Sequence, residues 1–432
     1  MRKTVKLLLL WAGVSLWFPS IALFLITDLW GCQLFLLLAA GLTLLWIVNM
    51  VRNGPTVKLP KDMVWFYSAV LLEGAICTVA SQDFSRSLQT YIANGLRLLL
   101  SAAICYWICR DSEYLSSFII GFRRAGIVSA VYAIFQAIAL PYDFPGSYIP
   151  LNNPSFLNST QAGAVSSSRA LGATPEPSVL ASLLIALVGI ETVNVVVFGG
   201  KKQYLTWIIV VAGYIETGSQ SIALLPLVLI LALALPLLLL KAPRRLDRTD
   251  MRALVVGGLA VALVLIASPS IIWSFSRMGG SNGPNVSAMT RLADILVGLF
   301  MFLDHPLTGV GLGVSPQMIL SYVSATHIPS FDSGITAGMF RMLAEEGLLA
   351  VAILLVGAIL AMPRFRMRDF NSHDAAVQGY LASYIVGIGL SSALFVGYTE
   401  LYPAWLLFPV ALAMKYSARQ RISVSSSTAA ER

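Results

Sequence analysis

Charged residues are scarce in this chain. Asp, Glu, Lys and Arg together make up 12% of its 432 residues, and hydrophobic residues make up 57%. An average soluble domain has roughly 25% charged residues. The mean hydropathy of the chain is +0.79. This composition excludes a soluble enzyme and indicates a protein embedded in a membrane.

Histidine and cysteine are also rare. The 3 histidines are not spaced as metal ligands, so the sequence predicts no metal centre built from histidine. The 4 cysteines all lie in apolar stretches, where neither a disulfide framework nor a zinc site is expected. We interpret them as small packing residues; they are Cys32, Cys77, Cys105 and Cys109.

Long apolar runs dominate the sequence. A helix needs about 20 apolar residues to span a bilayer. We predict twelve spans, near residues 7–27, 30–51, 63–80, 90–109, 117–140, 178–199, 203–217, 219–240, 253–275, 346–362, 376–397 and 400–414. The first resembles a secretory signal but lacks a small-residue cleavage site before Asp28, so we predict that it stays as a helix. The predicted fold is an all-α polytopic membrane protein, with residues 1–432 forming a single integral membrane domain.

The distribution of basic residues predicts the orientation. The chain has 29 Lys and Arg against 21 Asp and Glu, a net charge of +8. In a soluble protein this excess would suggest nucleic acid, but here its distribution matters more than its sum. With the amino terminus inside the cell, 23 of the 29 basic residues fall in inner segments, as the positive-inside rule expects. We therefore predict an even number of spans, both termini cytoplasmic and no nucleic-acid partner.

Two outer segments are long enough to build a site. The first covers residues 141–177 and the second, larger one covers residues 276–345. Binding and catalytic residues are concentrated in loops that a rigid scaffold positions. We expect chemistry on the outer face to belong mainly to these two periplasmic loops, with the active site in the larger one.

In the first loop, Arg169 opens the stretch Arg169-Ala-Leu-Gly-Ala-Thr-Pro-Glu-Pro-Ser178, which leads into the sixth predicted span. A guanidinium at the membrane surface suits a phosphate or pyrophosphate, because its planar fork binds phosphate oxygens two at a time. The alternatives are a lipid-headgroup anchor or a salt bridge to Glu176. Arg169 is thus a candidate for substrate binding.

The larger loop contains a predicted helix over residues 285–304, with Arg291 and Asp294 on one face. Its apolar run is too short to span a bilayer, so we expect an interfacial helix. Arg291 is a candidate for phosphate binding, and an internal pair with Asp294 is the alternative. The glycine-rich stretch 306–314 follows. Since no strand and no soluble βαβ unit accompany it, we predict tight turning against a helix rather than dinucleotide binding.

A helix is predicted over residues 333–362, longer than a span, with Arg341 and Glu345 four residues apart. A local ion pair is the default explanation for this spacing, although Arg341 is also a substrate-binding candidate. His327 and Asp332 precede the helix in the loop. Either has the chemistry of a general base, and the alternative for each is a structural role.

Two further candidates lie in or beside predicted spans. Arg97 is costly in lipid and should face a cavity or a partner, for which Glu73 is the obvious counter-charge. The short span 203–217 ends in Tyr214-Ile-Glu-Thr-Gly-Ser-Gln-Ser221. A short helix that breaks into polar residues is typical of a cavity wall, which makes Glu216 a candidate.

These pieces together resemble the Wzy-type polysaccharide polymerases and O-antigen ligases of bacterial envelopes. The resembling stretches are Arg169 to Ser178, Thr217 to Ser221, Arg291 to Gly313 with its Asp304-His305-Pro306-Leu307 and Gly309-Val310-Gly311, and Leu343 to Leu349. These motifs cover under a fifth of the chain. Each is loose, but their combination and order are fairly specific.

The resemblance implies an inverting glycosyltransferase of the C-type membrane superfamily in the bacterial inner membrane. It would polymerise undecaprenyl-diphosphate-linked oligosaccharide units into O-antigen or exopolysaccharide at the periplasmic face, without a metal, a nucleotide sugar or another cofactor. Arg169 and Arg291 would hold the pyrophosphate of the donor. The implied partners are the lipid-linked donor and acceptor glycans, membrane lipid and a chain-length regulator protein.

One departure favours a polymerase over a ligase. Ligases carry a His-Asn pair shortly before the glutamate of the closing helix, where this chain has Thr336 and Ala337. The general base is therefore left open among Glu176, His327, Asp332 and Glu216.

Two alternatives stay open. An O-antigen ligase would use the same donor but transfer the glycan to the lipid A core. A flippase or transporter of lipid-linked oligosaccharides would concentrate its charges in a membrane-spanning cavity rather than in two outer loops, and the sequence shows no internal repeat.

Overall fold

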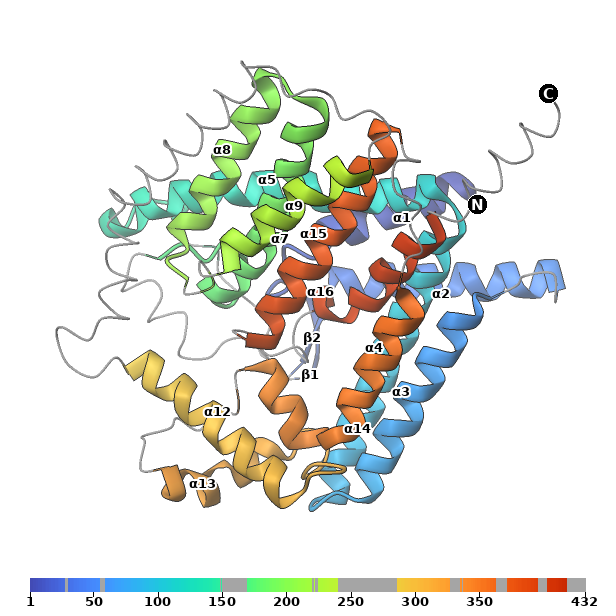
Figure 1. Cartoon of the computed structure of the whole chain (residues 1–432), viewed down its shortest axis with the longest axis vertical. Coiled ribbons are helices and arrows are strands. Elements are labelled where there is room, and N and C mark those ends of the chain that lie inside the picture. Colours follow the sequence, from blue (N-terminus) through green and yellow to red (C-terminus); the bar gives the residue numbers. More distant parts are fainter. Residues whose placement is uncertain are drawn as a thin grey trace. The chain divides into compact units, whose positions relative to one another are not determined.

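Helices form nearly all of the regular structure in the part of the chain that the computed structural model describes (Figure 1). The described residues are 1–27, 30–54, 59–147, 149, 169–219, 221, 224–239, 286–326, 335, 337–362, 371–394 and 402–417. The chain divides into two compact units. Unit 1 comprises Met1–Gly41, Asp111–Ser276 and Arg364–Gly389, and unit 2 comprises Leu42–Arg110, Arg277–Pro363 and Leu390–Arg432.

Unit 1 is a group of helices with one small hairpin. It contains α1 (Arg2–Ser15), β1 (Ala22–Thr27), β2 (Trp30–Gln33), α5 (Ser112–Ala139), the 3-10 turn η2 (Leu140–Tyr142), α7 (Pro177–Phe198), α8 (Lys201–Glu216), α9 (Leu225–Leu239) and most of α15 (Ser372–Leu394). Helix α5 packs against α1, α8 and α7, and α7 also packs against α8 and α9. The α7 helix is buried over nearly its whole length, which makes it the centre of this unit.

Small residues allow the close approach of α1 and α5. A side chain at Gly13 would meet the carbonyl oxygen of Phe118 at 2.3 Å, and one at Gly121 would meet that of Leu10 at 1.9 Å. Glycine at such positions lets two helix backbones touch, as is common between membrane helices. The Trp17 indole closes the contact by donating to the Phe122 carbonyl at 2.8 Å.

Unit 2 contains the remaining elements: most of α2 (Leu34–Asn53), α3 (Lys61–Val79), α4 (Phe84–Arg110), α12 (Val286–Asp304), α13 (Ser315–Thr326), α14 (Gly338–Ala361), α16 (Tyr402–Trp405) and a helical stretch over residues 407–417. Helix α14 packs against both α3 and α12, and α3 packs against α4. A buried apolar cluster that includes Val297, Val310 and Ala344 joins α12 and α14 to the chain between them.

Seven of the described helices are long and apolar enough to cross a bilayer: α2, α3, α4, α5 with η2, α7, α14 and α15. The protein is therefore a multi-pass, all-helical membrane protein. These helices match seven predicted spans to within a few residues at most ends. Helices α8 and α9 also lie at predicted spans, but they have only 16 and 15 residues. The predicted span 253–275 lies outside the described residues, and the count of twelve stays a prediction.

The prediction of one helix over residues 7–27 is wrong. Helix α1 ends at Ser15, and β1 pairs antiparallel with β2 from Ala22 to Thr27. Pro19 cannot donate a backbone hydrogen bond and clashes with the preceding helical turn. The run Ala-Leu-Phe-Leu-Ile-Thr that follows suits a strand as well as a helix.

The helix predicted over residues 333–362 starts later than expected. Ala337 has an extended backbone, and α14 begins at Gly338. The helix is also interrupted at Gly347, whose φ of 66° is not helical. The interruption separates the turn that carries Arg341 and Glu345 from the apolar stretch that follows. The interfacial helix predicted at 285–304 is confirmed as a helix, α12.

Candidate functional site

Residues 169–176, here called the arginine segment, lie in unit 1 directly before α7. Arg169 donates from Nε to the carbonyl of Thr217 at 3.0 Å and from Nη2 to the carbonyl of Gly218 at 3.1 Å. The backbone N–H of Ala170 adds a bond to the carbonyl of Glu216 at 3.2 Å. The arginine segment is thereby fastened to the end of α8.

The end of α8 is a polar break, as the sequence predicts. The Thr217 hydroxyl bonds to the Tyr214 carbonyl at 2.7 Å, and the hydroxyls of Tyr214 and Ser219 both contact the Ser221 hydroxyl at 3.1 Å. The last carbonyls of a helix carry partial negative charge and need donors from elsewhere. Arg169 supplies both the donors and the positive charge, so its guanidinium is held in a fixed orientation at this break.

Of the two carboxylate candidates of unit 1, Glu216 lies at this contact and Glu176 ends the arginine segment. Glu216 is the last residue of α8. Glu176 precedes the first turn of α7, and one of its carboxylate oxygens accepts a bond from the Ser178 hydroxyl at 2.8 Å. The Thr174 hydroxyl bonds to the carbonyls of Leu171 and Glu176 at 2.6 and 2.9 Å, which folds the arginine segment back on itself.

Residues 306–315, here called the glycine segment, lie in unit 2 against α14. The N–H groups of Val310 and Gly311 donate to the carbonyls of Ala344 and Glu345 at 2.8 and 3.0 Å. In the other direction, the N–H of Leu348 donates to the carbonyl of Pro306 at 2.8 Å. These bonds use the backbone groups that the interruption at Gly347 exposes. The predicted tight turn against a helix is confirmed.

Glycine is required in this segment for two reasons. Gly309, Gly311 and Gly313 all have positive φ, at 63°, 111° and 69°, a region that side chains disfavour. A side chain at Gly309 would also come within 2.3 Å of the Glu345 backbone, and one at Gly347 within 2.7 Å of the Leu307 backbone. The segment and the helix therefore meet backbone to backbone.

Glu345 joins the glycine segment to α14 through its side chain. Its carboxylate is 1% exposed and accepts bonds from the Gly313 N–H at 2.9 Å and the Ser315 hydroxyl at 2.6 Å. It also pairs with Nε of Arg341 at 3.0 Å, which confirms the predicted local ion pair. Arg341 therefore takes part in the structure of this site, and its binding of substrate stays a prediction.

One exposed hydrogen bond joins the two helices that flank the glycine segment. The Tyr322 hydroxyl on α13 donates to the Asp304 carboxylate at the end of α12, at 2.8 Å. Partial burial and the neighbouring Asp304 charge raise the pKa of Tyr322 to about 12, because both disfavour a phenolate.

The other predicted site residues fall in different places. Arg97 donates to the Asn94 side chain at 3.0 Å in α4. The proposed counter-charge Glu73 contacts other groups, namely the Cys77 thiol at 3.2 Å and the Glu346 carboxyl. Arg291 lies on α12, but its side chain is outside the described part, as are His327 and Asp332.

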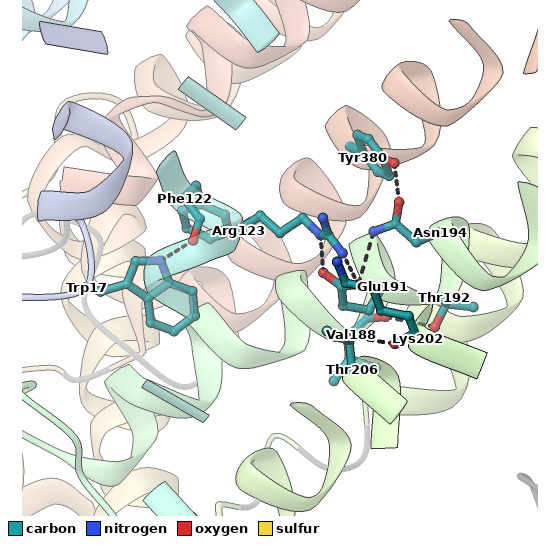
Figure 2. Close-up of polar contacts among 10 residues, drawn as sticks. All are labelled: Trp17, Phe122, Arg123, Val188, Glu191, Thr192, Asn194, Lys202, Thr206 and Tyr380. Atoms are coloured by element: carbon teal, nitrogen blue, oxygen red, sulfur yellow. Dashed lines mark hydrogen bonds and ion pairs between the residues drawn. The ribbon is translucent and has the colours of Figure 1, made fainter. Parts of the chain in front are cut away.

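A polar network that sequence reasoning missed crosses the centre of unit 1 (Figure 2). Arg123 of α5 binds both oxygens of Glu191 on α7, at 2.5 and 2.9 Å. Asn194 donates to Glu191 at 3.0 Å and accepts a bond from the Tyr380 hydroxyl of α15. Glu191 is fully buried, and this network ties three helices together.

The sequence does contain a signal for this network. Glu191 is the only ionisable residue in the 22 residues of α7, and such residues inside a span usually have a partner. The predicted orientation counts Arg123 with an inner loop, whereas it lies well inside α5, since this helix begins at Ser112. Sequence reasoning also missed Gln136 of α5, which is fully buried and bonds to the backbone of the arginine segment.

The cysteines fit their predicted role, because all four are unpaired as disulfides and buried. Within the described residues, no group of three or more His, Cys, Asp and Glu side chains is arranged to hold a metal ion. Comparison with known protein families finds no family model that matches the chain, and comparison with curated proteins finds no match either.

Proposed function

We propose that the protein is a membrane glycosyltransferase that polymerises undecaprenyl-diphosphate-linked oligosaccharide units at the periplasmic face of the bacterial inner membrane. One observation carries the proposal: the four stretches that resemble such polymerases pair with one another inside the two units. The arginine segment binds the polar break at 217–221, and the glycine segment binds 343–349.

The chemistry of these residues supports the same proposal. A lipid diphosphate becomes a good leaving group when fixed cations meet its developing charge. Arg169 and Arg341 are both held by hydrogen bonds, which reduces the entropy lost when they bind an anion. In this proposal arginines bind the diphosphate, and the candidates are Arg169 in unit 1 and Arg291 and Arg341 in unit 2. A carboxylate or imidazole among Glu176, Glu216, Asp332 and His327 takes the proton of the attacking sugar hydroxyl.

The geometry of unit 1 supports the proposed orientation. At 1.5 Å per residue, Glu191 lies about 20 Å along α7 from the arginine segment. That is about two thirds of the hydrocarbon thickness of a bilayer. The Arg123–Glu191 pair therefore lies in the half of α7 that is remote from the arginine segment, which is the cytoplasmic half if 141–177 is periplasmic.

The direct test incubates purified protein with a lipid-linked repeat unit and follows product length by gel electrophoresis or mass spectrometry. We expect a ladder of polymer that survives EDTA. The variants Arg169→Ala and Arg291→Ala should lower polymer yield more than a hundredfold at equal protein level. Arg86→Ala, at an exposed arginine on the predicted outer side, should leave the ladder unchanged. Near-normal polymer from both alanine variants would remove the diphosphate-binding role of these arginines.

A deletion strain separates a polymerase from an O-antigen ligase. Loss of a polymerase should leave single repeat units attached to their acceptor, with no long chains. Loss of a ligase should instead leave long chains on the polyprenyl carrier and the outer-membrane acceptor bare. Accumulation of long carrier-linked polymer would contradict the polymerase proposal and favour the ligase.

A further inference from the structure

Gln136 connects two separate stretches of backbone in unit 1. Its Nε2 donates to the carbonyl of Ser147 at 3.1 Å. Its Oε1 accepts from the N–H groups of Leu171 and Gly172 at 3.2 and 2.7 Å. Gln136 is fully buried near the end of α5, so these contacts are shielded from water. One amide therefore uses its donor for one stretch and its acceptor for another.

These two stretches are the entry and the exit of the predicted first outer loop. Ser147 ends the turn that follows α5, and Leu171 and Gly172 belong to the arginine segment. Tyr132, one helical turn before Gln136, also binds the entry turn by donating to the Gly146 carbonyl at 2.9 Å. Of these two side chains of α5, Gln136 is the one that holds both ends at once, so it acts as a clasp.

The backbone segment that Gln136 binds also carries the residues proposed to act on substrate. Gly172 has a φ of 61°, a left-handed conformation that favours glycine, and its N–H donates to Gln136. The Thr174 hydroxyl then bonds the carbonyls of Leu171 and Glu176. Arg169 lies two residues before Leu171 and is itself bonded to Thr217 and Gly218. A shift at Leu171 and Gly172 would therefore move both Arg169 and Glu176.

We propose that Gln136 is a positioning residue: it clasps the ends of the first outer loop and thereby sets the placement of Arg169 and Glu176. The clasp itself depends only on the contacts described above. Its effect on glycosyl transfer rests on the proposed function. The two parts are separable, because the placement of the arginine segment is measurable without any substrate.

The placement is read from a cysteine introduced at Ala173, which is buried in the arginine segment. In the Ala173→Cys protein, the rate of maleimide labelling reports whether the segment leaves its place, and the four native cysteines are buried. Gln136→Met keeps the size of the side chain but loses all its bonds. Gln136→Glu keeps an acceptor oxygen for the Leu171 and Gly172 N–H groups and loses the amide donor to Ser147. Tyr132→Phe is the matched control, since it removes the bond to the Gly146 carbonyl in the entry turn and leaves the bonds from Leu171 and Gly172 to Gln136 in place.

Each of these changes is made in the Ala173→Cys protein, and the labelling rate of the introduced cysteine is compared. We expect Gln136→Met to raise this rate at least tenfold, Gln136→Glu to raise it less than threefold, and Tyr132→Phe to leave it unchanged. In the polymerisation assay, Gln136→Met should lower kcat/KM at least a hundredfold, and Gln136→Glu should recover most of that loss.

The outcomes distinguish the two parts of the proposal. Unchanged labelling in Gln136→Met would overturn the clasp. Increased labelling with normal polymerisation would overturn the positioning role. A parent protein with no polymerase activity would contradict the proposed function, while the labelling result would still decide the clasp. If Gln136→Met does not fold, Gln136→Leu, which also removes the bonds to Leu171 and Gly172, takes its place with the same expected increase, and unchanged labelling in that variant overturns the clasp.

Discussion

The two units hold their motif-bearing segments in different ways. In unit 1, polar side chains bind the backbone: the buried Gln136 binds the arginine segment, and the half-buried Arg169 fastens this segment to the end of α8. In unit 2, backbone binds backbone, and glycine at positions 309 and 347 makes the approach possible. A side-chain contact can be weakened in steps, whereas a contact between backbones fails once any side chain is added. We therefore expect substitutions to destabilise the arginine segment by graded amounts, and any side chain added at the glycine contacts to destabilise the glycine segment strongly.

The largest effect is expected in the side-chain network of unit 1. Glu191→Ala leaves Arg123, whose side chain is 34% exposed, and the Asn194 amide without their acceptor, which should lower the free energy of unfolding by about 3–4 kcal/mol, the lower part of the range for breaking a buried pair. Unfolding of purified protein in detergent, followed by circular dichroism, measures this loss. The control replaces both partners, Arg123→Leu with Glu191→Leu, and should lose much less, since no charge is left unpaired. A double variant as unstable as Glu191→Ala would show that the network itself, not the unpaired charge, matters.

The next effect tests the backbone contact of unit 2. Gly309→Ala should cost about 3 kcal/mol, because a left-handed alanine costs about 1–2 kcal/mol and forced overpacking about 1–3 kcal/mol. Gly54→Ala is the matched control: Gly54 has a similar φ of 58°, but an added side chain meets nothing within 4 Å. Thermal unfolding of both variants compares them. Equal losses would mean that backbone conformation alone explains the requirement for glycine.

The sequence alone predicted the apolar spans better than the polar contacts. Helices such as α3, α4 and α7 follow from runs of apolar residues, since only a helix satisfies its own backbone in lipid. The wrong prediction at 7–27 arose because a short apolar run after Pro19 suits either a strand or a helix. Hydropathy measures how apolar a stretch is and does not determine whether its backbone forms a helix or a strand.

Polar contacts were harder to predict because their partners are remote in the sequence. Arg341–Glu345 was predicted, since four residues bring both to one helix face. Arg169 was identified as unusual, but its bonds to Thr217 and Gly218 depend on how α7 and α8 pack. Gln136 and Glu191 look like single tolerated polar residues in apolar runs. Only the structure shows what they bind: Glu191 binds Arg123 of α5, and Gln136 binds the arginine segment.

A smaller effect is expected from the one side chain that joins the glycine segment to α14. Glu345→Gln keeps an acceptor for the Gly313 N–H but loses the charge that pairs with Arg341, so we expect a loss of about 1–2 kcal/mol. A double-mutant cycle with Arg341→Met isolates the pair, and a coupling near zero would contradict this role of the charge. If Glu345→Gln instead cost as much as Gly309→Ala, the glycine segment would depend on side chains as the arginine segment does, and the contrast between the units would fail.

The smallest effect is expected at Tyr322, whose hydrogen bond to Asp304 is exposed, whereas the bonds of Gln136 are buried. Its bond to Asp304 joins the helices on either side of the glycine segment, so Tyr322→Phe should lower stability by only about 0.5 kcal/mol.

The pKa of Tyr322 is raised from 10.0 to about 12 in the folded protein, so the protonated phenol favours the folded state. Its contribution is fully present below the unfolded pKa of 10.0 and is lost as the pH rises toward about 12. Thermal unfolding of the wild-type and Tyr322→Phe proteins at pH 8 and pH 11 measures the difference, which should shrink at the higher pH. A difference that grows with pH would contradict the assigned proton. A stability loss as large as that expected for Glu345→Gln, at a buried carboxylate, would show that exposure does not weaken such a contact.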